Sequence, residues 1–238
     1  MDLKEEHILG DQISRHWYYR SKASALLKYL IGIKFSYILD VGAGSAFFSS
    51  FLLENTDASA ATCIDTSYSV NEDKIVAGKP LKCLKSCDSI EADLVLMMDV
   101  LEHVDDDIGL VREYSSKVPN GTWFLITVPA FPFLWSGHDV YLEHKRRYTI
   151  NQIEGVLRSG GLSVKRGSYF FGLIFPLAII RRTLGRRFRH RKDGGQSDLQ
   201  RHSWLVNMLL SFICKLELPM LYANRVAGLT IFCLAQKP

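Results

Sequence analysis

The sequence predicts an α/β fold with a doubly wound, mostly parallel, seven-stranded sheet, helices on both faces and a helical insertion before the last strand. Short, almost wholly apolar runs alternate with segments of helical periodicity, as expected for strands buried on both faces. A glycine-rich turn follows the first apolar run directly. The 238 residues are 47% hydrophobic and 23% charged, which is typical of a globular protein with one substantial core.

The expected elements follow one another along the chain. Apolar and aromatic residues at helical spacing predict an N-terminal helical cover in residues 1–35. Residues 36–168 form the expected α/β core, an apolar and basic helical insertion occupies 169–224, and 225–238 return as the final strand. The expected strands are 37–41, 60–64, 81–84, 93–98, 121–128, 162–167 and 228–235, and the expected core helices are 45–53, 106–117 and 150–158.

The distribution of charge and the spacing of the cysteines limit the classes of protein to which the chain can belong. Residues 181–202 hold eight Lys or Arg and two Asp within a chain of formal charge +4, which indicates a local anionic partner and argues against general nucleic-acid binding. The five cysteines lack the spacing of a zinc site, so we expect reduced thiols and no metal centre. The acidic, polar start is unlike a signal peptide, and no clean apolar stretch reaches about 18 residues. We therefore expect a cytoplasmic protein without a spanning helix.

The glycine turn lies in the segment ILDVGAGSA, residues 38–46. Gly42 and Gly44 would let the backbone approach a ligand closely at the carboxyl edge of the sheet. Asp40 precedes them, and a carboxylate there suits a cationic ligand and would repel a pyrophosphate. Ala46 replaces the third glycine of the dinucleotide fingerprint, which is a further argument against a nicotinamide oxidoreductase.

Asp65 ends the second expected strand, in the sequence CID. An acidic side chain at this position can accept hydrogen bonds from both hydroxyls of a ribose. The alternative is an ordinary aspartate that caps a turn after the strand.

A third motif, DLVLMMDVLEHV at 93–104, spans the fourth expected strand and the turn after it. Together with ILDVGAG at 38–44 and CID at 63–65, it resembles the class I S-adenosylmethionine-dependent methyltransferases over residues 36–170. The resemblance implies a Rossmann-like sheet of seven strands with the last one reversed, and S-adenosyl-L-methionine as cofactor across the ends of the first two strands. Within this family, the sequence resembles a bacterial branch with small-molecule, lipid or glycan acceptors.

The same resemblance assigns roles to acidic and glycine residues of this chain. The glycine turn and the end of the fourth strand hold the methionyl part, the second strand holds the ribose, and Asp88 is the nearest acidic candidate for the adenine. For Glu102 and His103, helix capping or packing at the cofactor edge competes with a catalytic role. The implied cofactor residues are Asp40, Gly42, Gly44, Asp65, Asp88 and Asp99.

Residues 128–149, after the fifth expected strand, combine histidines, acids and cations with aromatic residues, as an acceptor pocket requires. His138 or His144 could remove a proton from an acceptor hydroxyl, with Asp139 or Glu143 orienting the ring. Arginines could hold an acceptor carboxylate or phosphate. The alternative is a capped loop with solvated charges and an Arg147–Glu143 pair. The expected acceptor contacts are Trp135, Arg146, Arg147 and Tyr148.

Two apolar segments flank this predicted core. Residues 16–20 (HWYYR) resemble the aromatic segment that covers the cofactor in such relatives, or they are core packing. Residues 169–180 are apolar and run into arginines, which permits a peripheral membrane contact through 169–192 or a pocket for a lipid-linked acceptor. A helical lid or a dimer interface is the alternative reading of this insertion.

Two functional hypotheses follow. The first is an O-methyltransferase for a small-molecule or lipid-linked acceptor with an anionic group, located in the cytoplasm and in part at the inner membrane face. The second is a methyltransferase-like module that binds membrane surfaces without catalysis.

Overall fold

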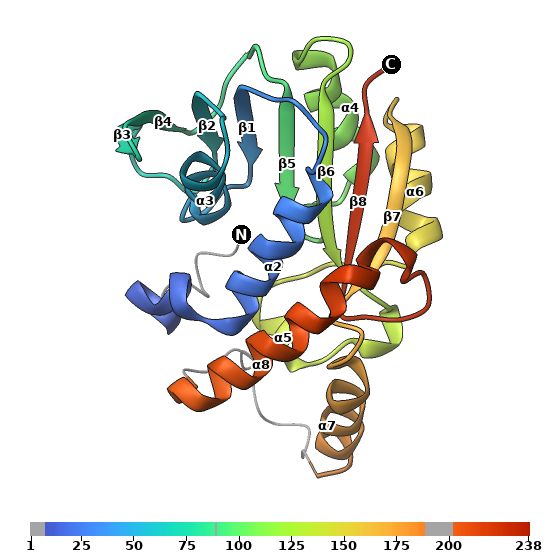
Figure 1. Ribbon diagram of the computed structural model, residues 1–238. Helices are drawn as coiled ribbons and strands as arrows, with labels where there is room; N and C mark the ends of the chain where they lie inside the picture. The colour runs from blue at the N-terminus through green and yellow to red at the C-terminus, as the bar shows by residue number, and fades with distance from the viewer. Residues whose placement is uncertain (1–7, 89, 189–201) are drawn as a thin grey trace.

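A computed structural model describes residues 8–88, 90–188 and 202–238 of the chain. It contains one eight-stranded sheet of order β3-β4-β2-β1-β5-β6-β8-β7 (Figure 1). The strands are β1 (Tyr37–Val41), β2 (Ala60–Ile64), β3 (Glu72–Val76), β4 (Lys79–Leu84), β5 (Leu94–Met98), β6 (Trp123–Pro129), β7 (Ser163–Phe170) and β8 (Thr230–Gln236).

The centre of the sheet is parallel and buried on both faces. Asp40 in β1 lies level with Cys63 of β2 and Leu96 of β5, so these strands end at one edge of the sheet. Successive strand residues alternate between two cores: Ile38 packs into one and Leu39 into the other. This alternation of apolar residues on both faces explains the nearly continuous apolar runs in the sequence.

The prediction of seven strands was wrong, because an additional strand, β3, forms a hairpin with β4 at the edge of the sheet. The hairpin turn is Ala77-Gly78, and both residues have positive φ (51° and 77°), as a tight two-residue turn requires. Four of the five β3 residues are exposed, so the strand has no apolar run to reveal it. The sheet is also less parallel than expected, since three of its seven pairings are antiparallel.

Helices cover both faces of the sheet. On one side α4 packs against α6, and α6 packs on β7 and β8; on the other side α2 contacts both α3 and α8 (Figure 1). The α-helices of the described chain are α2 (Trp17–Tyr29), α3 (Phe47–Asn55), α4 (Asp107–Lys117), α5 (Gly137–Tyr141), α6 (Ile150–Ser159), α7 (Phe175–Phe188) and α8 (Trp204–Glu217). The short 3₁₀ turns are η1 (Gly10–Arg15), η2 (Leu101–His103), η3 (Pro132–Leu134) and η4 (Leu218–Ala223).

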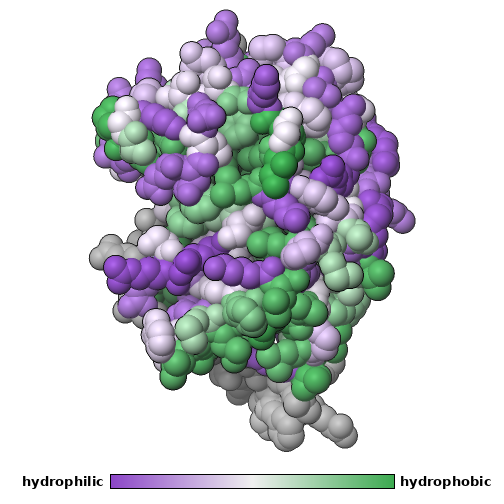
Figure 2. Space-filling view, viewed as in Figure 1, coloured by the Kyte–Doolittle hydropathy of each residue, from purple (hydrophilic) through white to green (hydrophobic). Residues whose placement is uncertain are grey.

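The chain between β7 and β8 forms α7, α8 and η4, beyond the carboxyl edge of the parallel strands (Figure 1). Residues 204–223 are helical throughout and are apolar and long enough to cross a membrane, with 17% of the apolar window buried. The stretch contains Lys215 and Glu217, so it is not a clean apolar run of about 18 residues, and the expected absence of a spanning helix stays a prediction. Figure 2 shows hydrophobic side chains gathered over α8. Residues 189–201, with part of the basic run, lie outside the described residues.

Candidate active site

The glycine turn between β1 and α3 is held against the end of β2. The backbone amide of Gly42 donates to the carbonyl of Ile64 at 2.7 Å. Gly42 has φ of 66° and Gly44 has φ of 53°, a region that suits glycine. A Cβ built on Gly42 would lie 2.7 Å from Cγ2 of Val100, so this position has no room for a side chain.

Carboxylates extend from the ends of the central strands beside this turn. Oδ2 of Asp65 accepts a hydrogen bond from the amide of Gly44 at 2.9 Å, which ties the end of β2 to the turn. Asp40 is buried, and its Oδ2 accepts from the hydroxyl of Ser49 at 2.7 Å. Its other oxygen, Oδ1, has no hydrogen-bond partner among the described residues. Burial raises the pKa of Asp40 to about 6, although the Ser49 hydrogen bond acts in the opposite direction.

Asp99 follows β5, with a φ of 56°, and forms a buried ion pair with Lys22 of α2. Its second oxygen accepts from the hydroxyl of Thr127 at 3.1 Å. The Lys22 side chain is fully buried; burial lowers its pKa, but the charge of Asp99 outweighs this and raises the pKa above its usual value. Sequence reasoning missed Lys22, although a lysine within an otherwise apolar helix face was the available signal.

A second carboxylate network organises the chain after β6. Asp139 is wholly buried and accepts from Arg147 through Nε at 2.6 Å and through Nη2 at 3.0 Å. It also bonds to Nδ1 of His144 at 3.0 Å and caps the start of α5 with Ser136. Burial raises the pKa of Asp139, but His144 and Arg147 outweigh it and hold the pKa well below its usual range. The capped-loop alternative paired Arg147 with Glu143, whereas the structure pairs it with Asp139.

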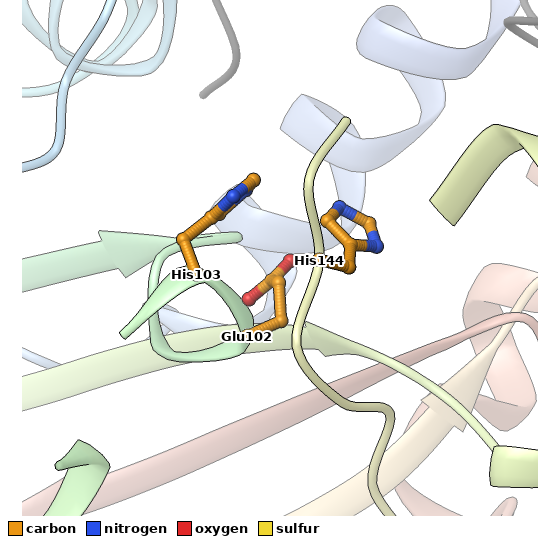
Figure 3. A group of neighbouring side chains, drawn as sticks. All are labelled: Glu102, His103 and His144. Atoms are coloured by element: carbon orange, nitrogen blue, oxygen red, sulfur yellow. The ribbon is translucent and has the colours of Figure 1, made fainter. Parts of the chain in front are cut away.

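Glu102 and His103 of η2 meet His144 of the chain after α5 (Figure 3). One potential ligand atom from each residue lies within 4.8 Å of the others. Glu102 is fully buried, and neither of its carboxylate oxygens has a hydrogen-bond partner in the described part of the chain. Burial, followed by the charge of Asp99, raises the pKa of Glu102 well above its usual value.

A cavity of about 310 Å³ opens beside these side chains at the carboxyl edge of the sheet. Its other wall is apolar and includes Ile174 and Leu177 from the insertion and Leu210 of α8. A larger hollow of about 720 Å³ lies between α2 and α8, but it contains none of the strand-end carboxylates, so we assign the site to the smaller cavity. Its polar residues include Asp99, Glu102, His103, His138, His144 and Arg147.

Comparison with protein families decides the class of this site. A model of the methyltransferase domain matches residues 14–165, which is well over half of the chain. The chain belongs to this family. It is therefore a methyltransferase, and S-adenosyl-L-methionine is the cofactor that the family implies. No curated protein matches the sequence.

Solved structures show that the methyltransferase shares its fold with distant proteins. An Archaeoglobus fulgidus SAM-dependent methyltransferase is 17% identical, with a TM-score of 0.55, and the match covers 99% of this chain and 98% of that one. A chain from the complex of the Haloferax volcanii Trm112 methyltransferase activator with a putative methyltransferase is 14% identical, with a TM-score of 0.57 and coverages of 95% and 92%. Haemonchus contortus phosphoethanolamine N-methyltransferase 2, solved with S-adenosyl-L-methionine, is 17% identical, with a TM-score of 0.53 and coverages of 91% and 52%.

The residues of the methyltransferase fit a cationic cofactor at the glycine turn. Val100 packs directly against Gly42, where any side chain would clash, and Asp40 offers a buried oxygen without a partner in the described structure. Asp40 near the end of β1, Asp65 after β2 and Asp99 after β5 lie at the same edge of the sheet as this turn, which suits a ligand with an ammonium and a sulfonium group. Asp99 lies on the boundary between the turn and the acceptor cavity.

The predicted acceptor residues separate into two groups. His138, His144 and Arg147 line the cavity, and Asp139 lies directly behind His144 and Arg147. The remaining predicted residues, Trp135, Arg146 and Tyr148, are not among the lining residues.

Arg146 and Tyr148 are bonded within the protein. Arg146 donates to Asp107 at 3.2 Å and to the carbonyls of Val104 and Asp105 at 3.0 and 2.9 Å. The hydroxyl of Tyr148 donates to Asp107 at 2.8 Å. These bonds fasten the segment after β6 to the start of α4. An acceptor contact by either side chain stays a prediction.

Two further predicted regions are placed by the structure. Asp88 is exposed in the loop after β4, and its adenine contact stays a prediction. In the N-terminal aromatic segment, Trp17 and Tyr18 line the cavity, whereas Tyr19 is buried in the core. Core packing therefore applies to Tyr19, and a role of this segment in covering the cofactor stays a prediction.

Proposed function

We propose that the methyltransferase transfers a methyl group to an oxygen of a small-molecule or lipid-linked acceptor that carries an anionic group. The observation that supports this proposal most directly is the composition of the cavity. Histidines and Arg147 line the side formed by the sheet, and apolar residues together with Arg181 and Arg182 line the side formed by α7. Such a cavity matches an amphipathic molecule with a negatively charged head. S-Adenosyl-L-methionine bound at the glycine turn would supply the methyl group on a sulfonium.

The proposed chemistry assigns proton removal to His138 or His144. Asp139 accepts from Nδ1–H of His144, so the lone pair of that ring lies on Nε2. The rings of His138 and His144 are 6.4 Å apart between centroids, so one acceptor hydroxyl can be within reach of either. Arg147 is held by Asp139 and by the carbonyl of Ala130 at 3.0 Å, which fixes a cation on the cavity wall.

We also propose a peripheral membrane contact at the cytoplasmic inner face. Leu177 and Ile180 of α7 are 61% and 55% exposed, and Leu209 and Phe212 of α8 are each 57% exposed. Apolar side chains exposed together on one face are typical of an interfacial helix pair. A lipid-linked acceptor could then enter the cavity between α7 and α8 without leaving the interface.

The acceptor is tested by incubating the full chain with methyl-labelled S-adenosyl-L-methionine and an extract that contains lipids and soluble metabolites. We expect label in an anionic product whose mass spectrum places the methyl group on oxygen. A product methylated only on nitrogen or carbon would overturn the proposal. His138→Ala and His144→Ala are compared in the same assay, with cofactor binding by calorimetry as the control for folding.

The membrane contact is tested by sedimentation with vesicles that contain anionic lipid. We expect the double variant Leu209→Ser with Phe212→Ser to weaken vesicle binding at least about fivefold. Full burial of each side chain in the membrane would contribute roughly 1.5–3 kcal/mol, and this is the upper limit of the loss for each change. Val226→Ser is the matched control, because Val226 is 84% exposed and lies outside α8. Equal binding by the two variants would rule out α8 as the docking surface.

A further inference from the structure

We propose that Glu102, His103 and His144 bind one divalent transition-metal ion of the zinc class at the wall of the acceptor cavity. The site itself is independent of the proposed function. Its role in positioning an acceptor oxygen rests on that function. Two imidazoles and one carboxylate are a set of ligands that zinc uses when it keeps a fourth position open.

The geometry of the three side chains permits a shared ion. Their potential ligand atoms lie within 4.8 Å of one another. Zinc bonds to nitrogen and oxygen of about 2.0–2.2 Å place tetrahedral ligand atoms roughly 3.3–3.6 Å apart, so small side-chain rotations close the site. The rings of His103 and His144 are 4.8 Å apart between centroids and nearly perpendicular, at 81°. In the view of Figure 3 the Glu102 carboxylate lies between the two rings.

Glu102 supplies a second, independent observation. Its side chain is fully buried, and among the described residues neither carboxylate oxygen has a hydrogen-bond partner. A buried carboxylate without partners is costly, and proteins rarely keep one without a ligand or a cation. The buried cation nearby, Lys22, is already paired with Asp99. A bound ion would therefore satisfy a buried acid that has no hydrogen bond within the described part of the chain.

The surroundings of His144 are those of a metal ligand. Its Nδ1 bonds to Oδ1 of Asp139 at 3.0 Å, and Nε of Arg147 donates to the same oxygen at 2.6 Å. Ligating histidines usually donate their other ring nitrogen to a carboxylate in this way, which fixes the ring and its tautomer. The arrangement leaves Nε2 of His144 as the nitrogen for an ion.

The ion would act on the acceptor. Three protein ligands leave a fourth position, and the same three residues line the cavity, so the hydroxyl oxygen of the acceptor can complete the coordination. Coordination lowers the pKa of a bound hydroxyl, which favours proton loss near neutral pH. With His144 on the ion, His138 is the histidine that remains to receive the proton.

The test uses the full chain after treatment with a chelator, without cofactor or acceptor. Calorimetry with Zn²⁺ and the visible spectrum of added Co²⁺ should give one ion per chain, with the spectrum of a four-coordinate site. His103→Ala and His144→Ala should lose about 100-fold or more in Zn²⁺ affinity, since even residues behind a ligand contribute 10–100-fold. His202→Ala, a histidine elsewhere on the cavity wall, is the matched control and should retain the site.

Glu102→Gln separates a ligand from a structural residue. It should weaken Zn²⁺ binding without lowering the thermal unfolding midpoint, because among the described residues the Glu102 carboxylate accepts no hydrogen bond that the change would remove. Absence of a stoichiometric site in the wild type, or equal affinity in all four variants, would overturn the proposal.

The failure of this proposal is distinguishable from failure of the proposed function. If the chelated protein still methylates an oxygen acceptor at the full rate and does not bind Zn²⁺, the metal site is wrong and the function stands. If Zn²⁺ binds as described but the acceptor atom is nitrogen or carbon, the site stands and the function is wrong.

Discussion

Two segments bring charged side chains to the same edge of the sheet, and the protein treats them in opposite ways. After β6, Asp139, Arg146 and Arg147 are all bonded to other protein groups. After β5, Glu102 is buried with no hydrogen-bond partner in the described structure. Both segments are rich in histidines and acids, so their composition alone does not distinguish them.

The comparison shows that hydrogen bonds and ion pairs within the protein distinguish residues that hold the fold in place from residues that are available to a ligand. A charged group that already has buried partners holds a segment in place, and a ligand would have to compete with those partners. A buried polar group without partners has its binding capacity available. The proposed acceptor site of this methyltransferase therefore combines a bonded frame after β6 with the unsatisfied carboxylate of Glu102 after β5.

The largest effect on stability is expected when Asp139, which bonds to Arg147 after β6, is removed. Asp139→Ala leaves Arg147 buried without its carboxylate, so we expect the free energy of unfolding to fall by about 3–5 kcal/mol. Urea denaturation measures this loss. Glu102→Gln, the matched change in the other segment, should stay within about 0.5 kcal/mol of wild type. Similar losses for the two variants would remove the distinction between the segments.

A second prediction extends the comparison to Asp40, which has one bonded oxygen and one without a partner. Its pKa is raised from 3.8 to about 6 in the folded protein, so the folded state binds the extra proton between these values. The contribution of Asp40 to stability is therefore present at low pH and is lost as the pH rises from about 4 to about 6. The upper limit of the change is about 3 kcal/mol.

The measurement for Asp40 is the difference in unfolding free energy between wild type and Asp40→Asn across this pH range. The difference should shift against the wild type as the pH rises and be constant above about pH 7. A difference that does not vary with pH would mean that Asp40 is not titrating there.

A third prediction concerns the ion pair between the N-terminal helix and β5. Lys22→Met removes the cation beside Asp99, whose side chain is 24% exposed, so solvent screens part of the effect. We expect a loss of about 2 kcal/mol, below the value for a fully buried pair. Adding Asp99→Asn to Lys22→Met should recover at least half of this loss. No recovery in the double variant would show that packing of the lysine stem, and not the charge pair, is the main contribution.

The smallest effect is expected at the tie between β6 and α4. Tyr148→Phe removes a hydroxyl that donates to Asp107 at 2.8 Å and to the carbonyl of Leu101 at 3.1 Å. We expect a loss of about 1 kcal/mol in thermal or chemical unfolding, and unchanged affinity for S-adenosyl-L-methionine. A large fall in cofactor affinity without a fall in stability would place Tyr148 in the binding site instead.

The sequence predicts the central strands well because a strand buried on both faces is apolar along nearly its whole length. The apolar runs of β1 and β5 and the glycine turn at Gly42 can be read without coordinates. By contrast, β3 is mostly exposed and has no such apolar run. The capped-loop alternative paired Arg147 with Glu143, four residues away, but its partner is Asp139, eight residues away in the first turn of α5. Partners of this kind depend on the path of the loop, which local spacing does not determine.

The insertion that forms one wall of the cavity begins at the end of β7 and ends at the start of β8, and these two points are neighbours in the sheet. β7 and β8 are antiparallel neighbours, and Phe170, at the end of one strand, is level with Thr230, at the start of the other. Residues 171–229 thus form one excursion with adjoining ends, and β1, β2 and the glycine turn lie elsewhere in the sheet. Such an excursion can be lengthened or replaced without moving the strands, so that the wall of the cavity can diverge in evolution while the glycine turn keeps its place in the sheet.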